Sequence, residues 1–507
     1  MTNIKEKARL LMADLEKTKE YFLQNYRKTK APVSIYTHLD ADGLSSGAIL
    51  GKALYKERIP FQITVLKQLE LSEIKKIVKQ VQNYQNFLIF SDFGSGQYLE
   101  LSTNLKVNGS PIPYIILDHH LPQSVKDKND KKIRQIYEET TPWHINPYFY
   151  DINGSTEVSG SGICFYFAKS LNSKNDKLAS IALIGAIGDI QNKGENGSFS
   201  GLNSLILNQA LEFEDIEIIN DLNFSSIKPL NEAIAYSSKI NLAGLSGNPN
   251  KVLKFLLRLG IIMEKQNGQI KTLNDLKQEE KIKVNSALIE YATVKLDIEP
   301  SEIYNNLITK RYILTNEVVG SELHDLSEFS NLLNSCGRTN NGSLGIAIAM
   351  GDRRVAYKKA KDNLIDYKKS IMKSLRWLSE NNIIQEREHI QFFDGKEVIN
   401  EMIVGTIASM LIFDEASVID KNKPLFGYAK RKGVDIYKVS GRAHQSIVDK
   451  GINLSEAIRD ALQMSELEAL GGGHPPAAGT KVPINKIELF LENLDKVVEN
   501  QFQKNSN

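Results

Sequence analysis

The stretch Tyr36-Thr37-His38-Leu39-Asp40-Ala41-Asp42-Gly43 follows a short apolar run, Val33-Ser34-Ile35, that is typical of a buried strand. After it, Gly43-Leu44-Ser45-Ser46-Gly47 opens an apolar segment with the composition of a helix. Two carboxylates this close together repel each other unless a positive charge lies between them. Asp and His are ligand types that suit manganese or magnesium, so the stretch indicates a metal site. The alternative is a turn in which Asp40 and Asp42 only cap the helix that follows.

Four apolar segments, including the first, are followed by acids. Each is followed within a few residues by acidic or imidazole side chains: Val33–Tyr36 by His38, Asp40 and Asp42; Phe87–Phe90 by Asp92; Tyr114–Leu117 by Asp118, His119 and His120; and Ile181–Gly188 by Asp189. Aspartate is rarely buried unless it is paired, so packing explains this repetition poorly. Singly, Asp92 could be a turn residue, His119-His120 a polar loop pair and Asp189 a surface acid at a helix end. Jointly these explanations require four coincidences in one place, whereas a two-metal site needs converging carboxylates and imidazoles.

Residues 31–202 are predicted to form an α/β domain around a doubly wound parallel sheet. Strands and helices alternate there, with a further strand at Phe61–Leu66 and helices at Gly47–Tyr55 and Leu71–Val81. In such sheets functional side chains collect at the carboxyl ends of the strands. An amphipathic helix over residues 1–30 precedes the domain, and we expect its apolar stripe to pack on it.

Two further regions complete the predicted organisation. Residues 203–320 have a mainly helical pattern and are interpreted as a helical connector. Residues 321–502 are predicted to form a smaller C-terminal α/β domain, with strands at Gly345–Met350 and Ile403–Gly405. A lysine-rich helix over Lys358–Ser379 is interpreted as a solvated face in preference to a nucleic-acid contact.

Length and composition restrict the class of protein. The chain has 507 residues, 41% hydrophobic and 24% charged, as expected for a globular protein of several domains. Its net charge of +2 neither favours nor excludes a nucleic-acid partner, which would need a local basic surface. Cys164 and Cys336 make no metal-ligand spacing. With no signal peptide and no apolar stretch of about 18 residues, the sequence predicts a cytoplasmic protein without a membrane partner.

The acidic segments together resemble the four motifs of the DHH phosphoesterase superfamily, in order and in spacing: His38-Leu39-Asp40-Ala41-Asp42-Gly43, Asp92, Asp118-His119-His120 and Asp189. Two segments near the C-terminus resemble the nucleotide-binding signature of the DHH-associated domain: Ser440-Gly441-Arg442 and Gly471-Gly472-Gly473-His474. A chain that carries both the four acidic motifs and this C-terminal signature is similar to the RecJ-like single-strand-specific exonucleases. The layout of the chain, with the segment Leu332–Arg338 and without a recognisable bacterial-type OB fold, is similar to the archaeal branch.

This resemblance implies a metal-dependent phosphodiester hydrolase with two divalent ions, Mn²⁺ in preference to Mg²⁺. Its metal ligands would be Asp40, Asp42, Asp92 as the bridge, His119, Asp189 and His38. The match is loosest at His38, because many members place the first histidine where Tyr36 stands. His120 would stabilise the scissile phosphate, and Asp118 would orient a histidine. Substrate would be bound by five residues of the second domain: Arg442, Gly471, Gly472, Gly473 and His474.

Three functions follow from the resemblance. The first is an exonuclease that releases nucleoside monophosphates from single-stranded DNA or RNA by two-metal hydrolysis. The second is a phosphodiesterase for short oligonucleotides or cyclic dinucleotides, although the helical middle and the long second domain favour longer polymers. The third is a replisome scaffold bound to GINS and the replicative helicase. The complete set of acids and histidines favours retained catalysis, which scaffolding does not exclude.

Overall fold

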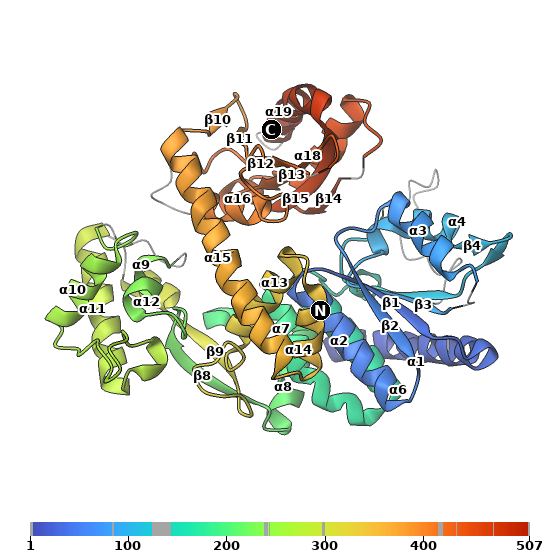
Figure 1. Ribbon diagram of the computed structural model, residues 1–507, viewed down its shortest axis with the longest axis horizontal. Helices are drawn as coiled ribbons and strands as arrows, with labels where there is room; N and C mark the ends of the chain where they lie inside the picture. The colour runs from blue at the N-terminus through green and yellow to red at the C-terminus, as the bar shows by residue number, and fades with distance from the viewer. Residues whose placement is uncertain are drawn as a thin grey trace. The chain divides into compact units, whose positions relative to one another are not determined.

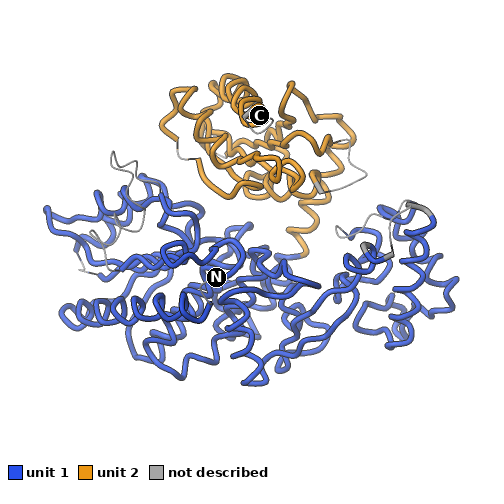
Figure 2. The backbone as a smooth tube through the Cα atoms, turned by 180° about the vertical axis from the view of Figure 1, so that it is seen from behind, with its two compact units in different colours: residues 1–364 blue, residues 365–507 orange. Residues whose placement is uncertain are grey.

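The computed structural model describes residues 4–83, 86–123, 143–237, 242, 244–296, 300–413, 419–431, 433–469 and 471–504. The chain divides into two compact units, Met1–Leu364 and Ile365–Asn507 (Figure 2). This division lies inside the region predicted from the sequence as the second domain, and the four predicted domain limits stay a prediction. Its position follows from α13 (Leu326–Arg338) and α14 (Gly342–Met350), which pack against helices of the first unit.

The first unit contains a five-stranded sheet in which every pairing is parallel, as predicted. In spatial order (Figure 1) its strands are β2 (Phe61–Leu66), β1 (Val33–His38), β3 (Leu88–Ser91), β6 (Tyr114–Leu117) and β7 (His144–Ile145). Strands β3 and β6 are buried throughout and β1 is buried except at its last residue, because helices cover both faces of the sheet. The carboxyl ends of β1, β3 and β6 therefore lie side by side.

Helices pack on both faces of this sheet. On one face α3 (Leu71–Val81) and α4 (Tyr98–Asn104) share a core with alternate strand residues such as Phe90 and Ile116. The other helices form a connected group: α2 (Ala41–Lys56), α6 (Gly160–Leu171), α7 (Ala179–Gly188), α8 (Gly201–Glu212), α13 and α14. Helix α1 (Ile4–Thr29) buries the predicted apolar stripe and packs on α6.

The middle of the chain is mainly helical, as predicted, and has a core of its own. Its helices are α9 (Leu230–Ala235), α10 (Pro249–Arg258), α11 (Gln278–Leu296) and α12 (Pro300–Leu307). A two-stranded antiparallel sheet, not predicted from the sequence, joins its two ends: β8 (Ile216–Leu222) pairs with β9 (Ile308–Leu314). The pairing brings the two ends of this region together, and the whole region lies within the first unit.

The second unit is also α/β. Its sheet has the order β10 (Gln385–Glu386), β11 (Gln391–Asp394), β12 (Leu425–Lys430), β13 (Ile436–Arg442), β15 (Ala477–Pro483) and β14 (Gly472–His474). One face packs on α18 (Leu454–Met464) and α19 (Ile487–Lys504), and the other on α15 (Val355–Asn381) and α16 (Val404–Phe413). The predicted basic helix lies within α15. No helix among the described residues is both long and apolar enough to cross a membrane.

Two predicted strands are wrong. Residues 345–350 lie in α14, and residues 404 and 405 begin α16. Both segments are short apolar runs, and periodicity does not separate a buried strand from a buried helix at this length. Helix α14 is apolar on most sides because it packs against both α2 and α13.

Candidate metal centre

Asp40 stands where β1 passes into α2. It is the N-cap of α2, and its Oδ1 accepts a hydrogen bond from the backbone N–H of Gly43 at 3.0 Å. Its Oδ2 lies 2.7 Å from Nδ1 of His38, at the end of β1. Asp40 therefore caps α2 with one oxygen, as the alternative predicted, and faces His38 with the other. Its role as a metal ligand stays a prediction.

Asp42 lies in the first turn of α2 and is fully buried. Its carboxylate accepts hydrogen bonds from the backbone N–H groups of Gly160, at 2.6 Å, and Ser161, at 3.0 Å. These groups form the N-terminus of α6, whose partial positive charge stabilises an anion. A Cβ at Gly185 would lie 2.4 Å from Asp42 Oδ1, so only glycine allows α7 to approach the carboxylate.

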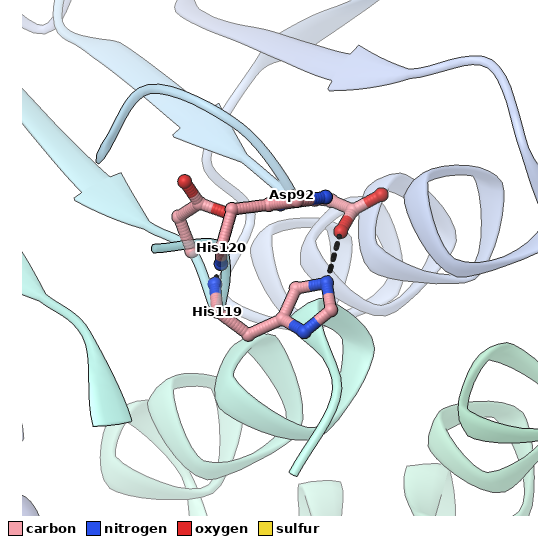
Figure 3. A group of neighbouring side chains, drawn as sticks. Asp92, His119 and His120 are labelled. Atoms are coloured by element: carbon pink, nitrogen blue, oxygen red, sulfur yellow. Dashed lines mark hydrogen bonds and ion pairs between the residues drawn. The ribbon is translucent and has the colours of Figure 1, made fainter. Parts of the chain in front are cut away.

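Asp92 follows β3 in a left-handed backbone conformation, with φ of 62°. Such strain in a residue other than glycine is concentrated at functional sites. The residue is 1% exposed, and neither carboxylate oxygen accepts a hydrogen bond of normal geometry from the described residues. Its ion-pair contacts are Oδ1 with His119 Nε2 at 3.2 Å (Figure 3) and Oδ2 with His38 Nδ1 at 3.6 Å. A buried carboxylate in this state needs a positive charge beside it, which a protonated imidazole or a metal ion can supply.

His119 is fully buried after β6. Its Nδ1 lies 2.7 Å from the carbonyl oxygen of Gly154, to which it donates, so Nε2 faces the acids. Nε2 lies 3.2 Å from both Asp92 and Asp189 and 3.6 Å from Asp42. Burial lowers the pKa of His119, but its close contacts with the carboxylates of Asp189 and Asp92 outweigh this effect and raise the pKa well above its usual value. The carboxylates thus favour a positive charge at this nitrogen.

Asp189 is the C-cap of α7, and its side chain is more exposed than those of Asp42 and Asp92, the other acids in contact with His119. A carboxylate at a helix C-terminus meets the negative end of the helix dipole, which is unfavourable for folding. The negative charge of Asp189 adds to the negative charges of Asp42 and Asp92. Burial, together with the charges of Asp92 and Asp189, raises the pKa of Asp42 well above its usual value.

The predicted ligands form two groups whose ligand atoms lie within 4.8 Å of one another: His38, Asp40 and Asp92, and Asp42, His119 and Asp189. Asp92 faces both groups, since one oxygen contacts His38 and the other contacts His119. The buried oxygens of Asp92, the excess of carboxylates and the imidazole nitrogens are the donor set that a divalent metal ion requires. The residues present therefore fit metal binding.

Asp118 differs from Asp92 because both of its carboxylate oxygens accept hydrogen bonds. Its Oδ1 accepts from Nδ1 of His120 at 2.8 Å, and its Oδ2 accepts from the backbone N–H of Ser95 at 2.9 Å. Burial raises its pKa, but the charge and the hydrogen bond of His120 outweigh this and hold the pKa well below its usual value. Asp118 therefore remains ionised and fixes the ring of His120, whose side chain is 33% exposed.

Several residues at the site were missed from the sequence. A Cβ at Gly160 would lie 2.5 Å from Asp92 Oδ1, and one at Gly154 would lie 2.0 Å from the carbonyl oxygen of His119. Gln191 Nε2 donates to the carbonyl of Gly154 at 2.9 Å and so helps to fix the acceptor of His119. The run Ser159-Gly160-Ser161-Gly162, before an apolar helix, is the signal that could have drawn attention to α6.

His144, at the start of β7, was also missed. Its ring is buried, stacks on Tyr98 with 5.5 Å between ring centroids, and places Nε2 2.7 Å from Oγ of Ser95. Burial lowers the pKa of His144 from 6.5 to about 4. The ring is therefore neutral in the folded protein at neutral pH.

This shift gives an expected pH dependence of stability. Between pH 7 and pH 4 the unfolded chain binds a proton at His144 and the folded chain does not, so acidification favours unfolding. The residue should lower the free energy of unfolding by about 3 kcal/mol over that range. We expect His144→Gln, which keeps an acceptor for Ser95, to flatten this part of the profile in urea unfolding at pH 7 and pH 4.5. Parallel profiles for the two proteins would contradict the assignment, and His444→Gln serves as the control.

The predicted substrate-binding residues lie together in the second unit. Arg442 and His474 both pair with Ala477, so the three residues form one row across β13, β15 and β14 and share a face of the sheet. Arg442 Nε donates to Oγ of Ser409 at 2.7 Å. Gly473 has φ of 140°, and a Cβ there would lie 2.3 Å from the carbonyl oxygen of Ala477. Gly471 and Gly472 precede it, and a Cβ at Gly472 would meet no atom within 4 Å.

Comparison with known families gives three matches along the chain. Residues 32–188 match the DHH family, N-terminal domain, residues 225–308 match the DHH-CID domain and residues 391–500 match the DHHA1 domain. An uncharacterised protein of Methanocaldococcus jannaschii is 31% identical over 490 residues, which cover 96% of each chain. The match to the middle of the chain was not anticipated from the sequence.

Solved structures with similar folds include the exonuclease RecJ and CDC45. RecJ from Thermus thermophilus in complex with Mn²⁺ matches with a TM-score of 0.53 at 15% identity, over 96% of this chain and 55% of that one. This chain thus spans about half the length of that RecJ. CDC45 from Entamoeba histolytica matches with a TM-score of 0.63 at 12% identity, over 96% and 99% of the two chains. From its domain matches, its full-length relative and its fold, this chain belongs to the DHH superfamily and has a RecJ-like architecture.

Proposed function

We propose that this chain is a metal-dependent phosphodiesterase that releases nucleoside monophosphates from the end of single-stranded nucleic acid. The observation that carries the proposal is Asp92, whose buried carboxylate faces two imidazoles and accepts no hydrogen bond from the described residues. Membership of the DHH superfamily supports hydrolysis of a phosphate ester. The RecJ-like architecture supports a polymeric substrate, since the similar solved structures include the exonuclease RecJ bound to manganese.

The proposed roles follow from the contacts of each side chain. Asp92 would be shared between two divalent ions, with His38 and Asp40 on one side and Asp42, His119 and Asp189 on the other. Such ions supply positive charge for the phosphate and lower the pKa of a bound water. We propose Mn²⁺ in preference to Mg²⁺, because two imidazoles stand among the ligands.

His120 would act on the substrate and not on the metals. Its Nδ1 is occupied by Asp118, so Nε2 is the ring nitrogen that can reach a phosphate. Burial lowers the pKa of His120 and the charge of His119 lowers it further, but the charge and hydrogen bond of Asp118 raise it overall. A protonated His120 would donate a hydrogen bond to the phosphate oxygen that gains negative charge during hydrolysis.

The second unit would hold the substrate's backbone. Arg442, His474 and the glycines Gly471, Gly472 and Gly473 offer a guanidinium, an imidazole and backbone N–H groups on neighbouring strands. Guanidinium and N–H groups are the usual partners of phosphate oxygens.

For this unit we expect Arg442→Gln to raise the KM for an oligonucleotide by about tenfold and to leave kcat nearly unchanged. A hydrogen bond to a charged group contributes about 1.5–3 kcal/mol, and a contact made equally in the ground state and the transition state changes only KM. Steady-state cleavage of a labelled 30-nucleotide strand measures both constants, with Arg431→Gln in the same unit as the control. A fall in kcat at constant KM would contradict a purely binding role.

Product analysis tests the proposed function. DNA and RNA strands carrying a label at either the 5′ or the 3′ end are incubated with the full chain and Mn²⁺ or Mg²⁺. We expect mononucleotides as the first products, with one end preferred and no cleavage in the presence of EDTA. A strong preference for a two-nucleotide substrate over a 30-nucleotide strand would instead support the alternative of a short-oligonucleotide phosphodiesterase. Absence of cleavage with either metal would overturn the enzymatic proposal.

A second candidate function is a replisome scaffold that binds GINS and the replicative helicase. The fold similarity to CDC45, which extends over nearly the whole of both chains, favours it. The two functions can coexist, because the acids and histidines of the site are all present. Co-purification of the full chain with GINS subunits tests the scaffold, and a chain that stays alone throughout would count against it.

A further inference from the structure

The loop that carries His120 is fixed at two points. The ring of His120 donates from Nδ1 to Asp118, and the backbone carbonyl of His120 accepts a hydrogen bond from Nδ2 of Asn146 at 2.8 Å. Asn146 is fully buried and follows β7, the strand that pairs with β6. The second anchor therefore follows a different strand, β7, than the one that precedes His120, β6.

Asn146 uses every hydrogen-bonding group of its side chain. Nδ2 donates one hydrogen to the carbonyl of His120 and the other to Oγ of Ser95, each at 2.8 Å. Oδ1 accepts from the backbone N–H of Tyr148 at 3.0 Å and so caps the short helix η2 (Pro147–Tyr150). These bonds fix the orientation of the amide, since exchanging its oxygen and nitrogen would break the bonds with the carbonyl of His120, which only accepts, and with the N–H of Tyr148, which only donates.

Ser95 closes the network. Its backbone N–H donates to Oδ2 of Asp118, and its Oγ accepts from Asn146. Its Oγ also lies 2.7 Å from Nε2 of His144. Asp118, Ser95 and Asn146 thus form a ring of buried hydrogen bonds that begins at the imidazole of His120 and ends at its carbonyl.

We propose that Asn146 is a positioning residue that sets the orientation of His120 toward the scissile phosphate. The inference rests on the function proposed above, in which His120 contacts the substrate. Within the described part of the chain, the hydrogen bonds of the Asn146 side chain go to His120, Ser95 and Tyr148 and not to the six candidate metal ligands, so its role is separable from metal binding. Residues that orient a group at a metal site typically contribute about 10–100-fold to activity.

The test uses Asn146→Asp. Aspartate has the same shape and can still accept from Tyr148, but as a carboxylate it cannot donate to His120 or Ser95. We expect kcat for oligonucleotide cleavage to fall by about 10–100-fold, with KM and the calorimetric affinity for Mn²⁺ nearly unchanged. The matched control is Asn175→Asp, because Asn175 is also fully buried and also donates to a backbone carbonyl, that of Ala168, at 2.8 Å.

A double-mutant cycle separates positioning from a structural effect. In a His120→Ala background, Asn146→Asp should lower kcat less than about 3-fold, because the group that it orients is gone. An equal loss in both backgrounds, or a loss of Mn²⁺ affinity that matches the loss of kcat, would overturn the proposal. If the wild type cleaves and Asn146→Asp has full activity, the proposal is also overturned. If the wild type itself does not cleave, the result overturns the proposed function instead.

Discussion

Asp92→Asn is expected to reduce oligonucleotide cleavage by about 10³-fold or more. The two groups of candidate ligands meet at this carboxylate, and an amide of the same shape carries no charge to hold a cation between His38 and His119. A loss of about 4 kcal/mol of charge stabilisation in the transition state corresponds to this factor. Cleavage of a labelled strand over a range of Mn²⁺ concentrations measures it.

The same substitution should have the opposite effect on the stability of the metal-free protein. Burial and the charge of Asp40 raise the pKa of Asp92, which means that the ionised carboxylate is unfavourable there without a cation. In EDTA, Asp92→Asn should therefore melt at the same temperature as wild type or higher. With Mn²⁺ at about 100 times its Kd, the wild type should gain about 2.7 kcal/mol, and the variant should gain much less.

Asp151→Asn is the matched control for this experiment. Asp151 is exposed, lies in the same unit and has a similar left-handed backbone, with φ of 55° against 62° for Asp92. Any effect of asparagine on the backbone strain is thus the same in both variants. If Asp92→Asn cleaved at the wild-type rate, or gained as much stability from Mn²⁺ as wild type, the assignment of this carboxylate would be wrong.

The parallel sheet was predictable because its central strands are buried on both faces. Tyr114–Leu117 is an uninterrupted apolar run, and its bounds and those of the half-exposed edge strand Phe61–Leu66 match the prediction. An acid directly after such a run must lie at the carboxyl edge, so the convergence of the acids followed from the order of the strands. The distance of His38 from the first acid did not exclude it from the group, since its Nδ1 lies 2.7 Å from Asp40.

The parts of the site that sequence reasoning missed depend on long-range contacts. Gly154, Gly160 and Asn146 approach the motifs from loops and helices that no local pattern links to them. Their residue types are common in turns and caps, so turn formation was a sufficient explanation for each. The apolar run in α14 failed for a related reason: whether it is a strand or a helix is decided by its neighbours α2 and α13.

Gly337→Ala is expected to weaken both the fold of the first unit and its affinity for Mn²⁺. A Cβ at Gly337, in α13, would lie 1.6 Å from the carbonyl oxygen of Leu39, the residue between His38 and Asp40. One turn earlier, Oδ1 of Asn334 accepts a hydrogen bond from the backbone N–H of Ala41 at 3.0 Å. Helix α13 therefore rests directly on the backbone of the first motif.

The clash is between a Cβ, whose position is fixed by the backbone, and a backbone oxygen, so no rotamer change can relieve it, and either α13 or the loop must move. Such overpacking costs about 1–3 kcal/mol, and the better helix propensity of alanine offsets up to about 1 kcal/mol of it. If the loop moves, His38 and Asp40 move with it, and we expect the Kd for Mn²⁺ to rise by about 10–100-fold. Calorimetry and thermal unfolding measure the two effects, with Gly96→Ala as the control because a Cβ there meets no atom within 4 Å. If Gly337→Ala is destabilised but binds Mn²⁺ with unchanged affinity, then α13 has moved and the loop with His38 and Asp40 has not. In that case α13 supports the fold without setting the geometry of the site.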